Sequence, residues 1–300
     1  MSQTGPLPRV ALLVTDLDNT LYDWFAMWYP AFNAMLETVC SKSGVPRSVL
    51  LAEIRAIHQE RGTSEYSYLL NELPSLKKLN PPEEITEVYR DAINRYRFMR
   101  QENLHLYPGA RDALVRIKDS GIPIVVYTES LGFYSAWRLR ELHLDGVVDY
   151  LYSPPDHDFP EGVTPEMLRS RPPEAYELDK TKYRETPRGI LKPDPQILKR
   201  ILRELDVSAS ETVYVGDSLM KDVAMAQDAG VFDVLAKYGA VKDRSAYRLL
   251  QQVSHWTEDD VQRESQINDR PNVTPSRVLH DRFDEIFDFF KFGETGCDRR

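Results

Sequence analysis

The chain has 300 residues, of which 42% are hydrophobic and 28% charged, and its formal net charge is −9 at pH 7. This length allows one large domain or two ordinary ones. The negative charge argues against a nucleic-acid-binding protein, because such a protein needs a basic surface to displace counterions from phosphates. The two cysteines, Cys40 and Cys297, lack the paired spacing of a zinc site or a redox dithiol, which fits a reducing compartment.

The first residues show no signal-peptide pattern, and no segment approaches the apolar length that spans a bilayer. We therefore expect a cytoplasmic protein that does not associate with a membrane. The sequence does not decide between a monomer and a homodimer.

The first predicted strand is the apolar run at residues 10–14, which is the kind of segment that a parallel sheet covered on both faces requires. Two acids, Asp16 and Asp18, follow at its carboxyl end. In open α/β sheets the ligand crevice lies at that end of the strands. The two acids are therefore the first candidate site residues.

Residues 23–103 carry apolar side chains at helical rather than strand spacing, so we expect several helices there. Early in this segment, four aromatic residues at helical spacing favour core positions over a substrate pocket. They are Trp24, Phe25, Trp28 and Tyr29. Near its end, three arginines indicate a solvent-exposed basic face rather than a site for a second anionic group. They are Arg90, Arg97 and Arg100.

From Tyr107 onward, predicted helices and strands alternate, which signals βαβ units and a parallel sheet. Strands are predicted at residues 122–130, 147–153, 211–218 and 231–239, and helices at residues 108–121, 131–142, 193–205 and 220–230. Residues 245–270 are polar and weakly periodic. Residues 276–292 predict a short strand and a terminal helix.

The fold class predicted by this pattern is α/β, with a doubly wound parallel sheet and a helical insertion. The sheet domain is expected to comprise residues 1–22 and 104–300, and the helical insertion residues 23–103. Residues 154–190 are rich in proline and charge, so we expect a long loop within the sheet domain, with a hairpin in it as an alternative. His157 belongs to a polar part of this loop rather than to a metal site.

Four further polar residues lie where an apolar strand ends or a helix begins. Thr128 ends the apolar run IVVYT, Lys192 opens the turn LKPDP before a helix, and Asp217 and Asp222 lie at the carboxyl end of another strand. Parallel strands bring their carboxyl ends to one edge of the sheet, so these side chains are expected to converge on the two acids of the first strand.

The predicted cluster of acids needs a counter-charge. Two carboxylates about 4 Å apart repel by about 4 kcal/mol at an effective dielectric constant of about 20. A set of oxygen ligands favours a hard divalent cation, and a site that also holds a phosphate favours Mg²⁺ over Ca²⁺. Lys192 adds a positive charge, which suits a dianionic substrate.

The segments DLDNT, VVYT, LKPDP and GDSLMKD, in this order, resemble the four motifs of the haloacid dehalogenase superfamily. The resemblance spans nearly the whole chain. It implies a Rossmann-like core, and it implies that residues 23–103 form a helical cap of the first cap class, which closes over the site and excludes water.

The resemblance also implies roles for the candidate residues. Asp16 would be the nucleophile that forms an aspartyl-phosphate, and Asp18 the general acid and base. Thr128 and Lys192 would bind the phosphoryl oxygens. Mg²⁺ would be bound by the carboxylates of Asp16 and Asp217 and by the backbone carbonyl of Asp18, with Asp222 in or just behind this set of ligands.

Two features depart from the commonest pattern of the superfamily. Glu129 follows Thr128 at a position where a small or amide residue is frequent, so an acid lies beside the expected phosphate site. The backbone amide of Glu129 is still expected to bind the substrate. The gap between Thr128 and Lys192 is long, which leaves Lys180 and Lys182 as poorer candidates for the motif lysine.

The expected function is a Mg²⁺-dependent phosphatase that hydrolyses a small phosphorylated metabolite. A phosphomutase shares every core residue and stays an alternative. A haloacid dehalogenase stays another, although Asp18 argues against it because that reaction needs no second acid. A catalytically silent phosphate-binding scaffold is the alternative outside enzymology.

Overall fold

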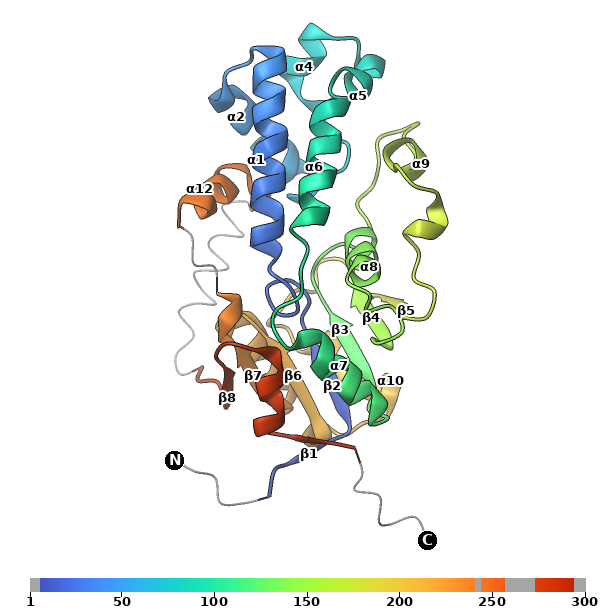
Figure 1. Cartoon of the computed structure of the whole chain (residues 1–300), viewed down its shortest axis with the longest axis vertical. Coiled ribbons are helices and arrows are strands. Elements are labelled where there is room, and N and C mark those ends of the chain that lie inside the picture. The colour runs from blue at the N-terminus through green and yellow to red at the C-terminus, as the bar shows by residue number, and fades with distance from the viewer. Residues whose placement is uncertain (1–5, 241–243, 257–272, 294–300) are drawn as a thin grey trace.

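The computed structural model describes residues 6–240, 244–256 and 273–293, and a seven-stranded parallel sheet lies at its centre (Figure 1). The strand order is β5-β4-β3-β2-β6-β7-β8. The strands are β2 (Leu12–Thr15), β3 (Ile124–Tyr127), β4 (Tyr150–Ser153), β5 (Lys182–Glu185), β6 (Thr212–Gly216), β7 (Phe232–Ala236) and β8 (Arg277–Leu279). The strand of this sheet that comes first in the sequence, β2, therefore lies in the middle of the sheet, between β3 and β6.

Helices cover both faces of this sheet. They are α7 (Ala110–Asp119), α8 (Gly132–Glu141), α10 (Gln196–Leu205) and α11 (Ala224–Ala229). Leu12 of β2 belongs to the buried apolar cluster that contains Ile197 of α10, whereas Leu13 belongs to the cluster that contains Leu114 of α7. Successive residues of a strand point to opposite faces, so a fully apolar strand fits a sheet that is buried on both sides.

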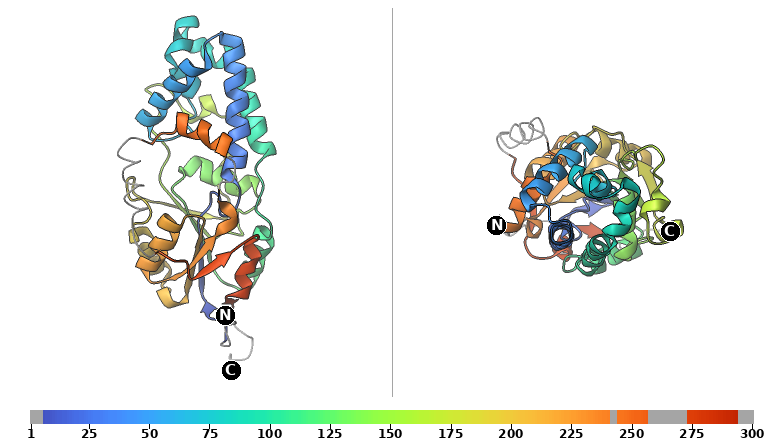
Figure 2. Two further views of the ribbon diagram at one scale, coloured as in Figure 1. Left: turned by 90° about the vertical axis from the view of Figure 1, so that its left-hand side faces the viewer. Right: turned by 90° about the horizontal axis from the view of Figure 1, so that it is seen from above.

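Residues 24–102 form a separate group of helices at one end of the molecule (Figures 1 and 2). They are α1 (Trp24–Ser43), α2 (Arg47–Arg61), α3 (Leu69–Glu72), α4 (Pro74–Leu79), α5 (Ile85–Val88) and α6 (Arg90–Glu102), with a 3₁₀ turn at Pro82–Glu84. The Asp23 carboxylate accepts a hydrogen bond of 2.7 Å from the Ala26 amide and so caps α1. Gly44 ends α1 in the left-handed conformation, at φ 70°.

The prediction of a doubly wound parallel α/β sheet with helices inserted after the first strand is confirmed. The core interpretation of the early aromatic residues is also confirmed. Phe25 and Trp28 are buried, and Trp24 and Tyr29 pack against the same core. The domain boundaries stay a prediction.

Residues 154–190 contain a strand that is not predicted from the sequence. This segment holds a short helix, α9 (Pro165–Leu168), a 3₁₀ turn at Pro173–Ala175, and the edge strand β5. The alternative of a hairpin is wrong, because β5 pairs with β4 in parallel. All four residues of β5 are exposed, so the apolar pattern that reveals the other strands is absent.

The C-terminal part also differs from its prediction. Residues 245–270 are predicted to be polar and only weakly periodic, but the first part of this segment belongs to a helix, α12 (Arg244–Val253). Residues 257–272 lie outside the described residues. The terminal helix predicted after β8 is a 3₁₀ helix, Phe283–Asp288. The chain then forms β9 (Lys291–Phe292), which pairs in parallel with β1 (Arg9–Val10).

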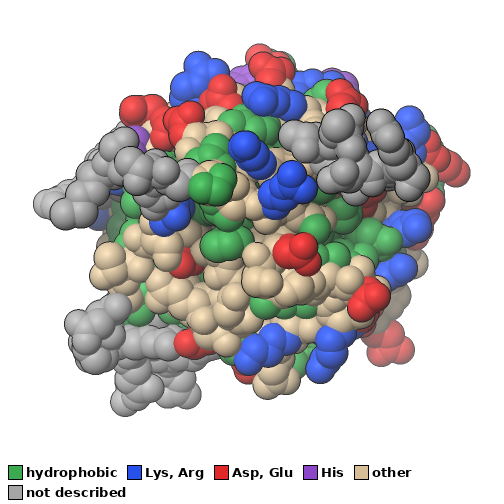
Figure 3. Space-filling model, turned by 90° about the horizontal axis from the view of Figure 1, so that it is seen from below, with side chains coloured by type: hydrophobic (Ala, Val, Ile, Leu, Met, Phe, Trp, Pro, Cys, Tyr) green, Lys and Arg blue, Asp and Glu red, His purple; other side chains and the backbone are tan. Residues whose placement is uncertain are grey.

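The free thiol of Cys40 is partly buried, and Cys297 lies outside the described residues. Within the part of the chain that the structure describes, no helix is long and apolar enough to cross a membrane. At the end of the molecule away from α1 and α6, acidic and basic side chains are interspersed (Figure 3), so charge of one sign is not gathered on that face.

Candidate active site

Three acids from different parts of the sequence meet beyond the carboxyl ends of β2 and β6. Asp16 directly follows β2, Asp217 directly follows β6, and Asp222 lies in the π-helical turn Leu219–Val223. One carboxylate oxygen from each lies within 4.8 Å of the other two. Among the described residues, this is the one group of acids, histidines or cysteines with the spacing of a metal site. The oxygen-only donor set fits Mg²⁺.

Lys192 is the cation of this cluster. Its Nζ lies 2.6 Å from Asp16 Oδ1 and 2.8 Å from Asp222 Oδ1, and its side chain is almost fully buried. Lys182, one of the two poorer candidates, is exposed in β5, where its ammonium lies over the Tyr150 ring. The structure therefore brings Lys192, rather than Lys182, to Asp16.

Burial determines the protonation of the cluster. It raises the pKa of the Asp16 carboxyl to about 7, although the Lys192 ammonium lowers it. Burial and the charge of Asp222 also raise the pKa of Asp217 well above its ordinary value. Burial acts to lower the pKa of Lys192, but the carboxylates of Asp16 and Asp222 raise it well above the usual value, so the ammonium stays charged. Three acids thus share one ammonium, and a divalent cation would relieve their mutual repulsion.

Asp222 is held in place from several sides. The Tyr214 hydroxyl donates to its Oδ1 at 2.8 Å, and the Ser218 amide donates to its Oδ2 at 3.0 Å. Its side chain is buried rather than exposed on a helix surface. A Cβ atom built on Gly216 would lie 2.3 Å from Asp222 Cγ, so only glycine leaves room for this carboxylate.

Asp18 faces a different set of partners. The hydroxyls of Tyr22 and Ser130 both donate to its carboxylate, and Arg138 Nη1 lies 3.4 Å from its Oδ1. Arg138 is fully buried in α8, and its Nη2 lies 2.6 Å from each carboxylate oxygen of Glu65. A chain of charged groups therefore links the segment after α2 to Asp18.

These partners of Asp18 are not predicted from the sequence. One signal for Arg138 is present, because it lies on the apolar face of the helical pattern LGFYSAWRLREL, where a charged side chain needs a buried partner. Glu65, Tyr22 and Ser130 carry no such signal, because their contact with this site depends on the tertiary structure.

Thr128 and Glu129 follow β3. The buried Thr128 hydroxyl oxygen accepts a hydrogen bond of 3.1 Å from the Ser130 amide. The Glu129 carboxylate accepts a hydrogen bond of 2.6 Å from the backbone amide of Lys192 and lies 3.7 Å from the Lys221 ammonium. The Glu129 side chain thus holds the turn that carries Lys192, and binding of substrate by its backbone amide stays a prediction.

The prediction of an exposed basic face on α6 is wrong for Arg100. Arg90 is exposed and pairs with Glu87, but Arg97 is half-buried and Arg100 is only 8% exposed. These two arginines turn toward the neighbouring segments because α6 packs along α1 on one side and borders a cavity on another.

Comparisons with known proteins agree with this arrangement. Residues 173–230 match the family model described as haloacid dehalogenase-like hydrolase. The chain is 26% identical over 236 residues to a glyceraldehyde 3-phosphate phosphatase of Pyrococcus furiosus, covering 77% of this chain and 82% of the relative. It is 23% identical to a protein of the same name from Methanopyrus kandleri, covering 78% and 87% of the two chains.

A solved structure resembles the whole fold. The 2-haloacid dehalogenase of Pseudomonas syringae pv. Tomato DC3000 superimposes with a TM-score of 0.53 at 20% sequence identity, covering 93% of this chain and 97% of that one. At this identity the likeness concerns the fold alone.

Proposed function

Because the chain belongs to the haloacid dehalogenase superfamily, we propose that it is a Mg²⁺-dependent phosphatase that hydrolyses a small phosphomonoester through an aspartyl-phosphate on Asp16. The observation that supports this most is the meeting of Asp16, Asp217 and Asp222 with Lys192 at one edge of the sheet. Relatives named as phosphatases support the same reaction class.

Asp16 is the proposed nucleophile. Its carboxylate attacks phosphorus and displaces the alcohol of the substrate, so the phosphoryl group is transferred to a carboxylate oxygen. A carboxylate needs no separate base to activate it, unlike a serine hydroxyl. The Lys192 ammonium, 2.6 Å from Asp16 Oδ1, favours the ionised form of this carboxylate against the effect of burial and attracts the phosphoryl oxygens.

Asp16, Asp217 and the backbone carbonyl of Asp18 would hold Mg²⁺, with Asp222 close behind. The ion would neutralise the acids and the charge on the transferring phosphoryl group. Asp222 also fixes Lys192 through its 2.8 Å contact.

Asp18 is the proposed general acid and base. It would protonate the departing alcohol oxygen and then take a proton from the water that hydrolyses the aspartyl-phosphate. Tyr22, Ser130 and Arg138 restrict its carboxylate to one orientation. Thr128, which follows the neighbouring strand β3, would donate to a phosphoryl oxygen.

Hydrolysis of an aryl phosphate and a panel of phosphometabolites tests this proposal. Because two relatives are named glyceraldehyde 3-phosphate phosphatases, that ester is the first member of the panel. We expect phosphate release with Mg²⁺ that stops with a chelator and in Asp16→Asn, whereas Asp119→Asn, which changes an exposed acid of α7, keeps full activity.

Each alternative has its own outcome in the same assay. Conversion of one phosphate ester into its isomer without phosphate release would indicate a mutase, and halide release without Mg²⁺ would indicate a dehalogenase. A folded protein that binds Mg²⁺ but turns over none of these substrates would contradict an enzymatic function. A cytoplasmic location and the choice between monomer and homodimer stay predictions.

A further inference from the structure

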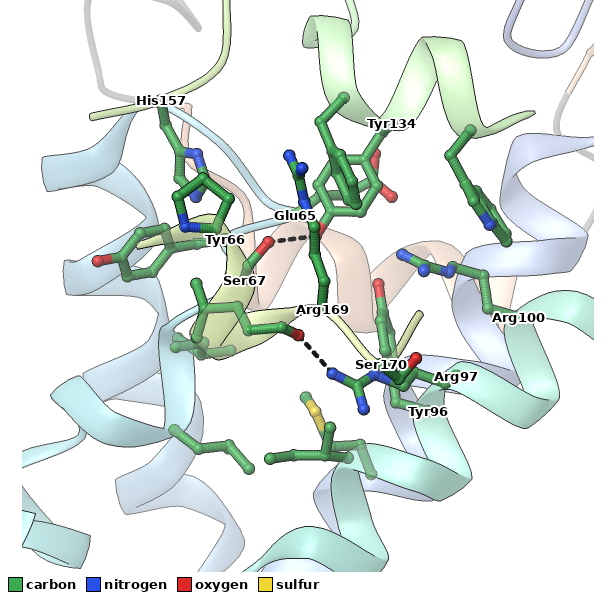
Figure 4. Close-up of a pocket in the computed structure, with 18 of the residues that line it drawn as sticks. Glu65, Tyr66, Ser67, Tyr96, Arg97, Arg100, Tyr134, His157, Arg169 and Ser170 are labelled. Atoms are coloured by element: carbon green, nitrogen blue, oxygen red, sulfur yellow. Dashed lines mark hydrogen bonds between the residues drawn. The ribbon is translucent and has the colours of Figure 1, made fainter. Parts of the chain in front are cut away.

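A cavity of about 400 Å³ lies between α6, α8 and the segments at residues 64–71 and 156–176 (Figure 4). None of the residues that surround it is Asp16, Thr128 or Lys192. Glu65 lines the cavity and also holds Arg138, which contacts Asp18. The cavity is therefore distinct from the acid cluster, and Glu65 and Arg138 connect it to Asp18.

Arg100 is the most unusual residue of the cavity wall. It is 8% exposed, and its Nε has no hydrogen-bond partner. Among the described residues, none accepts a hydrogen bond from its guanidinium, and no carboxylate lies within 4.0 Å of it. Its nearest neighbours are aromatic rings, with the guanidinium carbon 4.1 Å from the centre of the Trp137 ring and 5.2 Å from that of Tyr134. Figure 4 shows the guanidinium of Arg100 directed into the cavity.

A buried cation without an anion is costly, because burial removes its hydration without replacing it. Two acids line the cavity. Arg138 binds Glu65 at 2.6 Å, and the Asp156 carboxylate accepts a hydrogen bond of 2.7 Å from the Phe133 amide. Three more arginines border the cavity. Arg97 donates to the Leu168 carbonyl, Arg169 lies over the rings of Phe133 and Tyr176, and Arg171 pairs with Glu141. The cavity wall thus carries more arginines than acids, so its net charge favours an anionic ligand.

The rest of the wall is largely apolar. It includes Phe32, Met35, Leu70, Ile93 and Phe133. Apolar walls around a few polar groups are typical of sites for small organic ligands. The volume and the apolar lining suit a molecule with an apolar body. Arg100 suits an acidic group on that body, because guanidinium binds carboxylate or phosphate through paired hydrogen bonds.

We propose that this cavity binds a small amphipathic anion, whose carboxylate or phosphate group pairs with Arg100 and whose apolar body lies among the aromatic and aliphatic side chains. Two sources share this chemistry. The ligand is either the far end of the substrate, in which case the inference rests on the proposed phosphatase function, or a separate metabolite.

Titration calorimetry with phenylacetate and with phenylacetamide, its neutral counterpart of equal size, tests the proposal on the full chain. We expect the carboxylate to bind about tenfold more tightly than the amide, because a charge-assisted pair is lost in the amide. Arg100→Met should abolish this preference, and Arg100→Lys should keep most of it. Arg95→Met changes an exposed arginine of the same helix that does not line the cavity, and it should bind as the wild type does.

Equal affinity for the carboxylate and the amide in the wild-type protein would overturn the proposal, as would unchanged binding of phenylacetate to a folded Arg100→Met. If thermal unfolding shows that Arg100→Met does not fold, the wild-type comparison of the two probes and the Arg100→Lys variant decide the question.

Kinetics then identify the source. Competitive inhibition of aryl phosphate hydrolysis by phenylacetate would assign the cavity to the far end of the substrate, and binding without competition would assign it to a separate metabolite. Binding does not require turnover, so a protein that binds phenylacetate through Arg100 but releases no phosphate would contradict the proposed function and leave this inference standing.

Discussion

Arg138 and Glu65 form a buried ion pair in which one guanidinium nitrogen of Arg138 lies 2.6 Å from both carboxylate oxygens of Glu65. Arg138 belongs to α8 beside the sheet, whereas Glu65 lies between α2 and α3. The same guanidinium reaches Asp18 at 3.4 Å. The ion pair therefore connects the inserted helices to the proposed general acid and base.

Arg138→Met is expected to reduce both stability and turnover. It leaves Glu65 as an unpaired buried charge, which typically costs about 3–5 kcal/mol of unfolding free energy. The double variant Arg138→Met with Glu65→Leu should recover most of this stability, since both charges are removed. Its kcat should stay about tenfold or more below that of the wild type, because Asp18 loses a partner. Urea unfolding and steady-state kinetics measure the two effects, and recovery of kcat in the double variant would show that Arg138 has only a structural role.

Mg²⁺ is expected to stabilise the folded protein. A ligand at a hundredfold excess over its Kd adds about 2.7 kcal/mol to the unfolding free energy, and here it also relieves the repulsion among Asp16, Asp217 and Asp222. Asp217→Asn should abolish the rise in Tm with Mg²⁺ while its Tm without the ion equals or exceeds that of the wild type. Differential scanning calorimetry with and without Mg²⁺ measures this. The same loss in Asp119→Asn would place the ion elsewhere.

Gly216→Ala is expected to displace Asp222. The added Cβ would lie 2.3 Å from Asp222 Cγ, so the carboxylate must leave its position 2.8 Å from Lys192 Nζ. Crowding of this kind costs about 1–3 kcal/mol, and we expect phosphatase activity to fall about tenfold or more. If displacement of Asp222 is the cause, the effect of Gly216→Ala and that of Asp222→Asn will not add in the double variant. Additive losses would indicate a different cause.

His58 is expected to make stability depend on pH. It is fully buried, its Nδ1–H donates to the Val253 carbonyl at 2.6 Å, and burial lowers its pKa to about 4. The unfolded chain binds a proton near pH 6.5 and the folded chain only near pH 4, so stability is greatest above pH 6.5 and falls as the pH drops. The loss between pH 8 and pH 5 is about 2 kcal/mol.

His58→Gln removes this titration. Its unfolding free energy, measured by urea at pH 8 and pH 5, should therefore decline by about 2 kcal/mol less than that of the wild type. Equal declines in the two proteins would mean that His58 is protonated as easily in the folded chain as in the unfolded one.

Strand prediction succeeded where both faces of a strand are buried and failed where they are exposed. β2 and β3 consist of buried residues, so their apolar runs are visible in the sequence. The edge strand β5 is exposed throughout and is defined only by its pairing with β4. Likewise β9 is a strand because β1, at the opposite end of the sequence, lies beside it.

The sequence by itself determined the parallel sheet, the helical insertion and the candidates Asp16 and Asp217, because a strand that is buried on both faces marks its own carboxyl end. It indicated Lys192 through the turn LKPDP that precedes a helix. Only the tertiary structure decided how Asp18 is held and which side of α6 is buried. Both depend on contacts between residues far apart in the chain, such as Arg138 with Glu65 and Arg100 with Trp137. The periodicity of apolar residues indicates which face of a helix or strand is buried. It does not indicate which residue pairs with a buried charge, because that partner comes from a distant segment that packing brings close.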